Sequence, residues 1–513
     1  MKKSISWVVA ILLVFGLSAQ RAGAQDIAPS QSLKKVKTEN ESTIYSFNYP
    51  SVNARGEETV LSSALIAWTP SFRHDDDSIE SVHIFCHVTI TDDKERPSAS
   101  QSLRDRQLLT TMIGRNYKLL SKQGDYVSRA IIIAPDYEGY GVTKTSPHPY
   151  LSQRLTARQV TDAVTYGMQL YRKAVEEGSQ LAMKSDWRTF AYGCSQGGAV
   201  ALATQRHIEE QGLADELHFK GSICCEGPYD LVATLRYYLE DDGDTSGIST
   251  DHRKGICTMP VVYPFIMKGM VDTHPDMKDY TINDLLSQQL IDTGVIDWLE
   301  SKNFNTNGIH EMWYHQLQEG LDANGRHYTP EQMAELFESP SENMVWGHLK
   351  NMTTPEVYNY MNNPANFETV PAEPTNAAQA LHRALVDNSL TTGWTPQHRI
   401  QFVHSKGDTA VPYANYLSWR DAQPQGDIYR VDDTFSKADH LDASIMFYMN
   451  LCLSRNFTDI FEWLSEQPAE SGIKGIEWDK DNGTWYTLDG RKLQGKPASK
   501  GMYINNGQKI VIR

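Results

Sequence analysis

The segment from residue 188 to residue 211 constrains the fold of this chain more than any other. Residues 188–192 predict a strand, residues 199–211 predict an alanine-rich helix, and residues 193–197 (GCSQG) join the two. A turn this tight forces its serine into a strained backbone conformation, and small residues must flank it because the helix packs closely on the strand. The segment therefore predicts a sheet-and-helix domain in which Ser195 stands at the edge of the sheet.

Strands and helices alternate on both sides of this turn. Further strands are predicted at 44–49, 59–68, 82–87, 130–134, 219–225, 399–405 and 428–431, and helices at 156–178 and 443–452. Such alternation favours a largely parallel sheet with helices on both faces. We therefore predict an α/β domain whose two parts are separated by an insertion.

The insertion lies between about residues 235 and 395, where the strand pattern stops. Its sequence predicts helices, including one over 281–302 and others that begin at Thr329-Pro330 and Thr354-Pro355, since threonine caps a helix and proline fits its first turn. Many of its residues are large and apolar. We expect a helical cap over one end of the sheet, with most of these side chains filling the core of the cap itself.

The two ends of the chain differ in composition from the rest. Lys2 and Lys3 precede an apolar run over 5–17, and residues 22–24 (AGA) then supply the small side chains of a cleavage site. This pattern predicts a secretory signal peptide and an exported, periplasmic or extracellular protein. Beyond residue 466, strands are predicted at 485–488, 502–505 and 508–512, the last two joined by a hairpin at residues 506–507 (NG).

The predicted organisation has five parts. They are a signal peptide (1–24), the first part of the α/β core (25–235), a helical cap insertion (236–395), the second part of the core (396–466) and a C-terminal β tail (470–513). No run after the signal peptide is long enough to span a membrane. Oligomeric state is left open.

Composition excludes several functional classes. A formal net charge of -16 argues against a nucleic-acid partner. The six cysteines do not form a disulfide framework in a chain of 513 residues, and a pairing of Cys257 with Cys452 stays open. Four others are predicted to be buried thiols: Cys86, Cys194, Cys224 and Cys225. We expect no metal, since His83 and His87 lie on a strand and would be about 13 Å apart.

A serine nucleophile needs a base, because its free hydroxyl is too weakly acidic at neutral pH. In this kind of domain the acid and then the histidine follow the serine along the chain. The last α/β segment contains His398, His404 and His440. The first two come too early, before or within the strand that leads to the acid. His440 follows the strand at 428–431 and is therefore the predicted base.

Asp408 is the predicted acid, because it follows the strand at 399–405 through a Gly-Asp step. Five other acids are rivals: Asp432, Asp433 and Asp439 near His440, and Glu226 and Asp230 after an earlier strand. A loop aspartate more often forms a turn than it catalyses a reaction. For the oxyanion hole, the amide of Gln196 is one predicted donor, and Val88 or Thr89 supplies the other.

Several blocks resemble the secretory-lipase-like branch of the α/β-hydrolases, which is related to fungal lipase A enzymes and to bacterial secreted esterases. The blocks are residues 87–89 (HVT) with 96–98 (RPS), 135–141 (PDYEGYG) with 148–150 (HPY), 193–198 (GCSQGG), 227–231 (GPYDL) and 407–413. The resemblance implies an α/β-hydrolase fold, a helical cap, ester hydrolysis, no cofactor, and Thr89 as the second oxyanion residue. Val88 replaces the usual glycine of its loop, and Cys194 replaces the common tyrosine.

The C-terminal tail, residues 485–512, resembles a β module found on exported proteins of Gram-negative anaerobes. The predicted function is therefore a secreted serine hydrolase that acts on small-molecule or saccharide-linked carboxylic esters. Two alternatives remain. A serine peptidase of the same fold would need an acidic clamp, such as Glu138 or the acids at 240–244. A hydrolase-like surface protein would bind its ligand without catalysis.

Overall fold

The computed structural model describes most of the chain. The described residues are 27–39, 41–99, 129–239, 257–319, 347–408, 410–423, 427–432, 438–453, 455–466, 485–487, 493, 501–505 and 508–512. The predicted signal peptide, the helix start at Thr329-Pro330, the acid at Asp433 and the acids at 240–244 lie outside these residues.

A sheet of nine strands forms the centre of the molecule, in the order β1-β2-β3-β5-β4-β6-β7-β8-β9. The strands are β1 Lys34–Glu39, β2 Ser42–Val52, β3 Glu58–Trp68, β4 Ile79–Cys86, β5 Ala130–Pro135, β6 Met183–Cys194, β7 Phe219–Cys225, β8 Arg399–Val403 and β9 Tyr429–Asp432. Strands β4 to β9 pair in parallel, as predicted. Strands β1 to β3 form an antiparallel edge, because short turns connect them.

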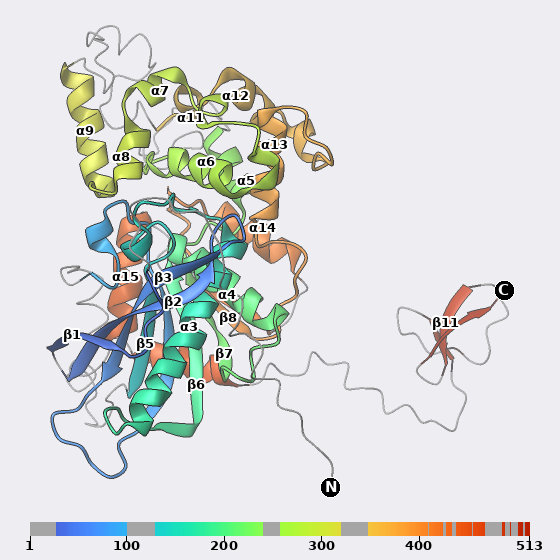
Figure 1. Ribbon diagram of the computed structural model, residues 1–513. Helices are drawn as coiled ribbons and strands as arrows, with labels where there is room; N and C mark the ends of the chain where they lie inside the picture. The colour runs from blue at the N-terminus through green and yellow to red at the C-terminus, as the bar shows by residue number, and fades with distance from the viewer. Residues whose placement is uncertain are drawn as a thin grey trace, which may run out of the picture.

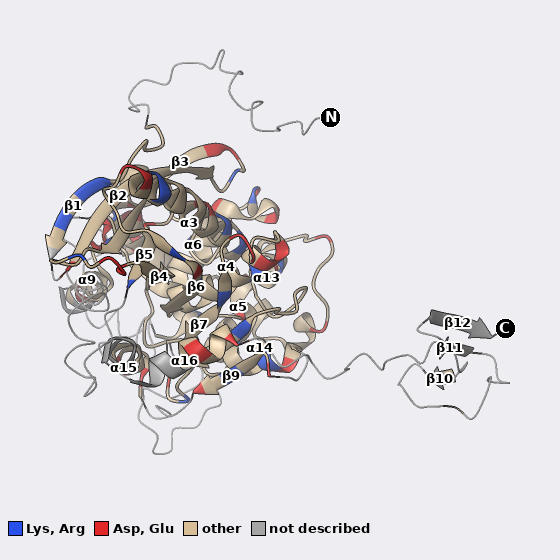
Figure 2. Ribbon diagram, turned by 90° about the horizontal axis from the view of Figure 1, so that it is seen from below, with Lys and Arg blue, Asp and Glu red and all other residues tan. Residues whose placement is uncertain are grey.

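Helices cover both faces of this sheet. Helices α3 (Gln153–Glu176) and α4 (Gln196–Glu210) lie on one side, and α15 (His440–Leu453) and α16 (Arg455–Ser465) lie on the other (Figure 2). Helix α14 (Ala414–Ala422) connects β8 to β9. All six residues of β5 are buried, as expected for a strand covered on both faces. The α/β-hydrolase architecture predicted from the sequence is therefore confirmed.

The insertion forms a helical layer at one end of the sheet (Figure 1). Its helices are α5 Leu231–Leu239, α6 Val262–Thr273, α7 Gln288–Asp292, α8 Val295–Ser301, α9 Thr306–Glu319, α11 Leu349–Met352, α12 Pro355–Met361 and α13 Ala377–Asp387. Strand β7 leads directly into α5, so this is the end where the parallel strands finish. The layer has its own hydrophobic core, which includes Tyr263, Phe265, Met267, Met270, Trp313 and Met361. These side chains therefore fill the core of the cap, as predicted.

The prediction of a single helix over 281–302 in the cap is wrong. The segment contains a 3-10 turn at Ile282–Asp284 followed by the separate helices α7 and α8. Ser287 starts α7, with its hydroxyl accepting a hydrogen bond from the amide of Leu290 at 3.3 Å. Gly294 has φ +85°, a left-handed conformation that separates α7 from α8. The helical spacing of apolar residues continues through all three elements, so the sequence pattern predicted one helix.

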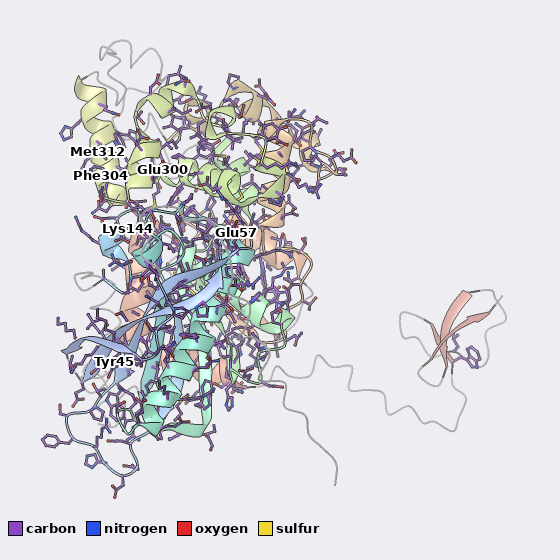
Figure 3. All side chains as sticks on the ribbon, viewed as in Figure 1. Tyr45, Glu57, Lys144, Glu300, Phe304 and Met312 are labelled. Carbon is purple, nitrogen blue, oxygen red and sulfur yellow. The ribbon has the colours of Figure 1, made fainter. Side chains whose placement is uncertain are left out.

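Hydrogen bonds to backbone carbonyls tie the cap to the α/β core at the segment that precedes α9. The hydroxyl of Thr91 donates to the carbonyl of Phe304 at 2.7 Å, and the amide of Asp93 donates to the carbonyl of Lys302 at 2.8 Å. The ammonium of Lys302 in turn donates to the carbonyl of Lys144 at 2.8 Å. Figure 3 shows Lys144 and Phe304 at this junction. The loop after β4 is therefore held from the cap side as well as from the sheet.

The C-terminal strands form a sheet of their own. Strands β10 (Trp485–Thr487), β11 (Gly501–Asn505) and β12 (Gln508–Ile512) are antiparallel in the order β10-β11-β12. Asn505 pairs with Gln508, so the predicted hairpin across residues 506–507 is confirmed in its register. Within the described part of the chain, we find no helix with the length and apolar character that crossing a bilayer requires.

Candidate active site

Ser195 lies at the turn between β6 and α4, where the sequence placed it. Its φ of +57° and ψ of -126° are unusual for a residue with a side chain and show the strain that a nucleophile elbow imposes. The amide of Ser195 donates to the carbonyl of Cys225 on the neighbouring strand β7 at 2.9 Å. This bond fixes the turn against the sheet and lifts the serine side chain beyond the strand end.

The glycines after Ser195 are required by close packing. A Cβ on Gly197 would lie 2.1 Å from the carbonyl oxygen of Cys86, and one on Gly198 would lie 2.2 Å from the carbonyl oxygen of Cys225. These are backbone atoms of β4 and β7, which cannot move aside. Helix α4 can therefore start directly above the sheet only because both positions lack a side chain.

The three residues predicted as nucleophile, base and acid meet at this point. His440, the first residue of α15, places Nε2 2.9 Å from the hydroxyl of Ser195. Its Nδ1 lies 2.7 Å from Oδ2 of Asp408, in the loop after β8. Ser195 and His440 are each 8% exposed, and Asp408 is 3% exposed. The result is a continuous hydrogen-bonded chain from carboxylate to imidazole to hydroxyl.

The backbone of its own turn holds the Asp408 carboxylate in place. Oδ1 accepts hydrogen bonds from the amides of Ala410 at 2.9 Å and Val411 at 2.7 Å. These two bonds occupy one carboxylate oxygen and leave Oδ2 to face His440. Aspartate commonly organises a turn in this way, so the local sequence after Gly407 both forms the loop and orients the acid.

The environment of His440 makes it a strong base. Burial acts to lower the pKa of His440, but the charge of Asp408 and its hydrogen bond outweigh burial and raise that pKa to about 8. An imidazolium formed here is therefore stabilised by the carboxylate on its Nδ1 side. That is the property required of a group that must take a proton from serine.

Two of the rival acids serve structural roles. Asp439 precedes α15 and accepts a hydrogen bond from the amide of Asp442 at 2.9 Å. Asp230 precedes α5 and accepts one from the amide of Ala233 at 3.0 Å. Both bonds are those of helix-capping aspartates. Asp432 belongs to β9.

Glu226, the remaining rival, lies at the site together with Asp408. Its side chain is fully buried, and Oε2 lies 3.5 Å from Nδ1 of His440. Its other oxygen accepts a hydrogen bond from the amide of Ser405 at 3.2 Å. From the sequence, Glu226 and Asp408 were alternative candidates for the acid, whereas the structure places both beside the imidazole of His440.

The loop after β4 begins beside the elbow, because Cys86 pairs with Gly193 across the sheet. The carbonyl of Val88 accepts a hydrogen bond from Nδ1 of His87 at 2.7 Å. The hydroxyl of Thr89 bonds with that of Tyr150 at 2.7 Å. Gln196 is the first residue of α4, where helix amides lack intrahelical partners. Gln196 and Thr89 thus lie on the two segments that flank the serine turn, and their oxyanion role stays a prediction.

His148 is a residue of this region to which the sequence assigned no role. The amide side chain of Gln196 donates to its Nε2 at 3.1 Å, and its Nδ1 donates to the carbonyl of Glu138 at 2.6 Å. Burial lowers the pKa of His148 to about 3, so the ring stays neutral and can accept from Gln196. The HPY block at 148–150 was the available signal, although it did not indicate this contact.

Three side chains at the site have the spacing of a metal-binding group. One ligand atom each from Glu226, Asp408 and His440 lies within 4.8 Å of the others. However, Asp408 and His440 are 2.7 Å apart, which is hydrogen-bond distance. Two ligands that each lie about 2 Å from an ion would be farther apart than this. The arrangement suits proton sharing better than metal binding.

The fold is shared with solved structures of esterases. A rice cell wall degrading esterase, LipA from Xanthomonas oryzae, is 20% identical with a TM-score of 0.53, over 80% of this chain and 87% of that one. A Legionella pneumophila protein described as a hydrolase is 14% identical with a TM-score of 0.54, over 84% and 91%. No family model and no curated protein matches the sequence. These likenesses show that the chain has the α/β-hydrolase fold.

Proposed function

We propose that this protein is a secreted serine hydrolase that cleaves carboxylic esters through an acyl-enzyme. The observation that carries the proposal is the hydrogen-bonded chain of Ser195, His440 and Asp408, with distances of 2.9 and 2.7 Å. The strained backbone of Ser195 and the raised pKa of His440 support it, because both are features of sites in which a histidine activates a serine.

The proposed reaction has two halves. His440 takes the proton of Ser195 through Nε2 as the serine oxygen attacks the ester carbonyl. The amides of Gln196 and Thr89 stabilise the oxyanion, and His440 then protonates the leaving alcohol. A water molecule, deprotonated by His440, attacks the acyl-enzyme, and His440 then gives this proton to the oxygen of Ser195 as the acid leaves. Asp408 holds Nδ1 protonated throughout and remains ionised.

The cap contributes an apolar wall next to the oxyanion loop. Phe265 of α6 stacks on Tyr150, with ring centroids 4.3 Å apart and an interplanar angle of 11°. Tyr150 in turn bonds to Thr89. We infer that this side of the cap would lie beside the acyl or aryl part of an ester bound at Ser195. The description of the Xanthomonas oryzae relative as cell wall degrading favours including saccharide-linked esters among the substrates.

A peptidase is the less favoured alternative. It would need a free acid to bind the amino group of a peptide, and Glu138 was one candidate. The carboxylate of Glu138 is buried and accepts a hydrogen bond from the side chain of Gln159 at 2.7 Å. Burial also raises the pKa of Glu138, so the group is poorly suited to bind a cation in solvent.

A panel of substrates tests the proposal. Purified protein is assayed on p-nitrophenyl esters of increasing chain length, on an acetylated polysaccharide and on aminoacyl anilides. We expect hydrolysis of short esters and not of anilides, and a loss of at least about 10⁴-fold in kcat for Ser195→Ala with the fold intact. Faster cleavage of anilides than of esters would favour the peptidase. Ligand binding with no turnover of any substrate would favour the binding protein.

A further inference from the structure

Two carboxyl groups reach the same imidazole from adjacent strands. Glu226 directly follows β7, and Asp408 lies in the loop after β8. The two strand ends are tied together, since Cys225 pairs with Val403 and the amide of Glu226 donates to the carbonyl of Val403 at 2.8 Å. Glu226 has φ +45°, an uncommon conformation for glutamate, which the surrounding structure must impose.

The side chain of Glu226 is incompletely satisfied. Its Oε1 accepts from the amide of Ser405, whereas Oε2 has no hydrogen-bond partner although the side chain is fully buried. Nδ1 of His440 lies 3.5 Å from this oxygen. A buried oxygen without a partner costs stability, so its retention beside the base calls for an explanation.

The two carboxyl groups differ in how well their charge is stabilised. Asp408 accepts from two backbone amides and from His440, whereas Glu226 accepts from one amide. Burial, and after it the charge of Asp408, raise the pKa of Glu226 well above its usual range. Of the two carboxyl groups, Glu226 is therefore the one that holds a proton.

We propose that Glu226 is a second acid for His440, a positioning residue beside Asp408 that can orient Nδ1 in its place. The inference rests on the proposed function. When Asp408 is removed, one of the two main causes that keep Glu226 protonated is lost; burial remains, so Glu226 releases its proton to solvent only as the pH rises. Its Oε2 then accepts the Nδ1–H bond and preserves the productive tautomer of the imidazole.

A double-mutant cycle tests this inference by measuring kcat and KM on one p-nitrophenyl ester. Glu226→Gln alone should cost less than about tenfold in kcat, because Asp408 remains. Asp408→Ala should cost about 10²-fold, and adding Glu226→Gln should cost about 10²-fold more, reaching the roughly 10⁴-fold loss typical of a missing acid. KM should change little throughout. The second acid thus predicts strong non-additivity.

Asp408→Asn provides a contrasting variant. Its amide oxygen would keep the bonds to Ala410 and Val411, so its NH₂ group would face Nδ1 and hold the wrong tautomer despite Glu226. We therefore expect Asp408→Asn to be less active than Asp408→Ala. Without the second acid, Asp408→Ala would also lack an acceptor for Nδ1, so the two variants should lose similar activity.

The pH profile supplies a readout that a packing role would not alter. In Asp408→Ala, kcat/KM should increase with pH as Glu226 ionises, and this step should vanish on adding Glu226→Gln. The other titratable groups facing this carboxyl are Cys194, Cys225, Asp439 and His440, and all remain in both variants. The step is therefore assignable to Glu226.

The inference is overturned if Glu226→Gln costs the same factor in the presence and absence of Asp408, which would indicate packing alone. Thermal melting checks each fold. Should Asp408→Ala not fold, Asp408→Ser, which keeps an oxygen near the amides of Ala410 and Val411, replaces it in the same cycle. A wild-type protein that hydrolyses no ester would instead contradict the proposed function, before any variant is compared.

Discussion

At the scale of single residues, the direction of each hydrogen bond determines what the site can do. Two backbone amides occupy Oδ1 of Asp408, so the carboxylate presents Oδ2 to His440. An ionised carboxylate can only accept, which places the proton of the neutral imidazole on Nδ1. Nε2 is then free to accept the proton of Ser195. The backbone of one turn thereby sets the tautomer of the base.

The raised pKa of His440 predicts the pH dependence of hydrolysis. Catalysis requires neutral His440, so kcat/KM should be low when the imidazole is protonated and should increase as pH rises through about 8. An ordinary histidine would give this transition near 6.5. Asp408→Asn removes the charge that raises the pKa and should shift its residual activity toward lower pH. A wild-type transition at or below pH 6.5 would contradict the account.

At the scale of elements, the junction of β6 with α4 is the most demanding part of the structure. The start of α4 lies against β4 and β7 so closely that Gly197 and Gly198 have no room for a Cβ. The cap also reaches the acid loop, since the hydroxyl of Tyr238 on α5 donates to the carbonyl of Ala410. The site thus depends on the close packing of α4 on β4 and β7 and on the contact of α5 with the acid loop.

Gly198→Ala tests the packing at this junction. Its Cβ would lie 2.2 Å from the carbonyl oxygen of Cys225, so we expect a loss of at least about 2 kcal/mol in the free energy of unfolding and a large loss of activity. Gly308→Ala in α9 is the matched control, because its nearest neighbour is a side-chain atom at 3.3 Å. It should be neutral or stabilising by up to about 1 kcal/mol. Equal effects of both variants, measured by denaturant unfolding, would contradict this packing.

The sequence predicted those elements whose signals are local. The strand-turn-helix at Ser195, the chain order of Asp408 and His440, and the hairpin at 506–507 each follow from a short pattern with a physical cause. The contacts of Glu226 and His148 could not be predicted in this way, because they depend on how segments distant in sequence converge. The break at Gly294 was missed since the apolar periodicity continued through it.

At the scale of the whole molecule, the cap and the α/β part each have a hydrophobic core, and the tail has its own sheet. Ser195, His440 and Asp408 come from the α/β part, and the cap contributes Tyr238, whose hydroxyl donates to the carbonyl of Ala410 in the acid loop. The described strands of the tail begin at Trp485, beyond the last helix of the α/β part. The tail therefore supplies none of the residues assigned to the reaction.

Removal of the tail should leave catalysis nearly unchanged. A chain that ends after about residue 470 retains every residue assigned to the reaction, and we expect its kcat/KM on a short ester to remain within about twofold of the full chain. Circular dichroism and thermal melting establish that the shortened chain is folded. A folded but inactive chain would show that the tail helps to form the site.

Direct labelling tests whether His440 activates Ser195 as a nucleophile. A fluorophosphonate probe reacts covalently with such serines, and mass spectrometry of the digested protein locates the adduct. We expect one phosphonylated residue, Ser195, in the wild-type protein, with labelling abolished in Ser195→Ala and strongly slowed in His440→Ala. An unlabelled wild-type protein, or an adduct at another residue that persists in Ser195→Ala, would contradict this expectation.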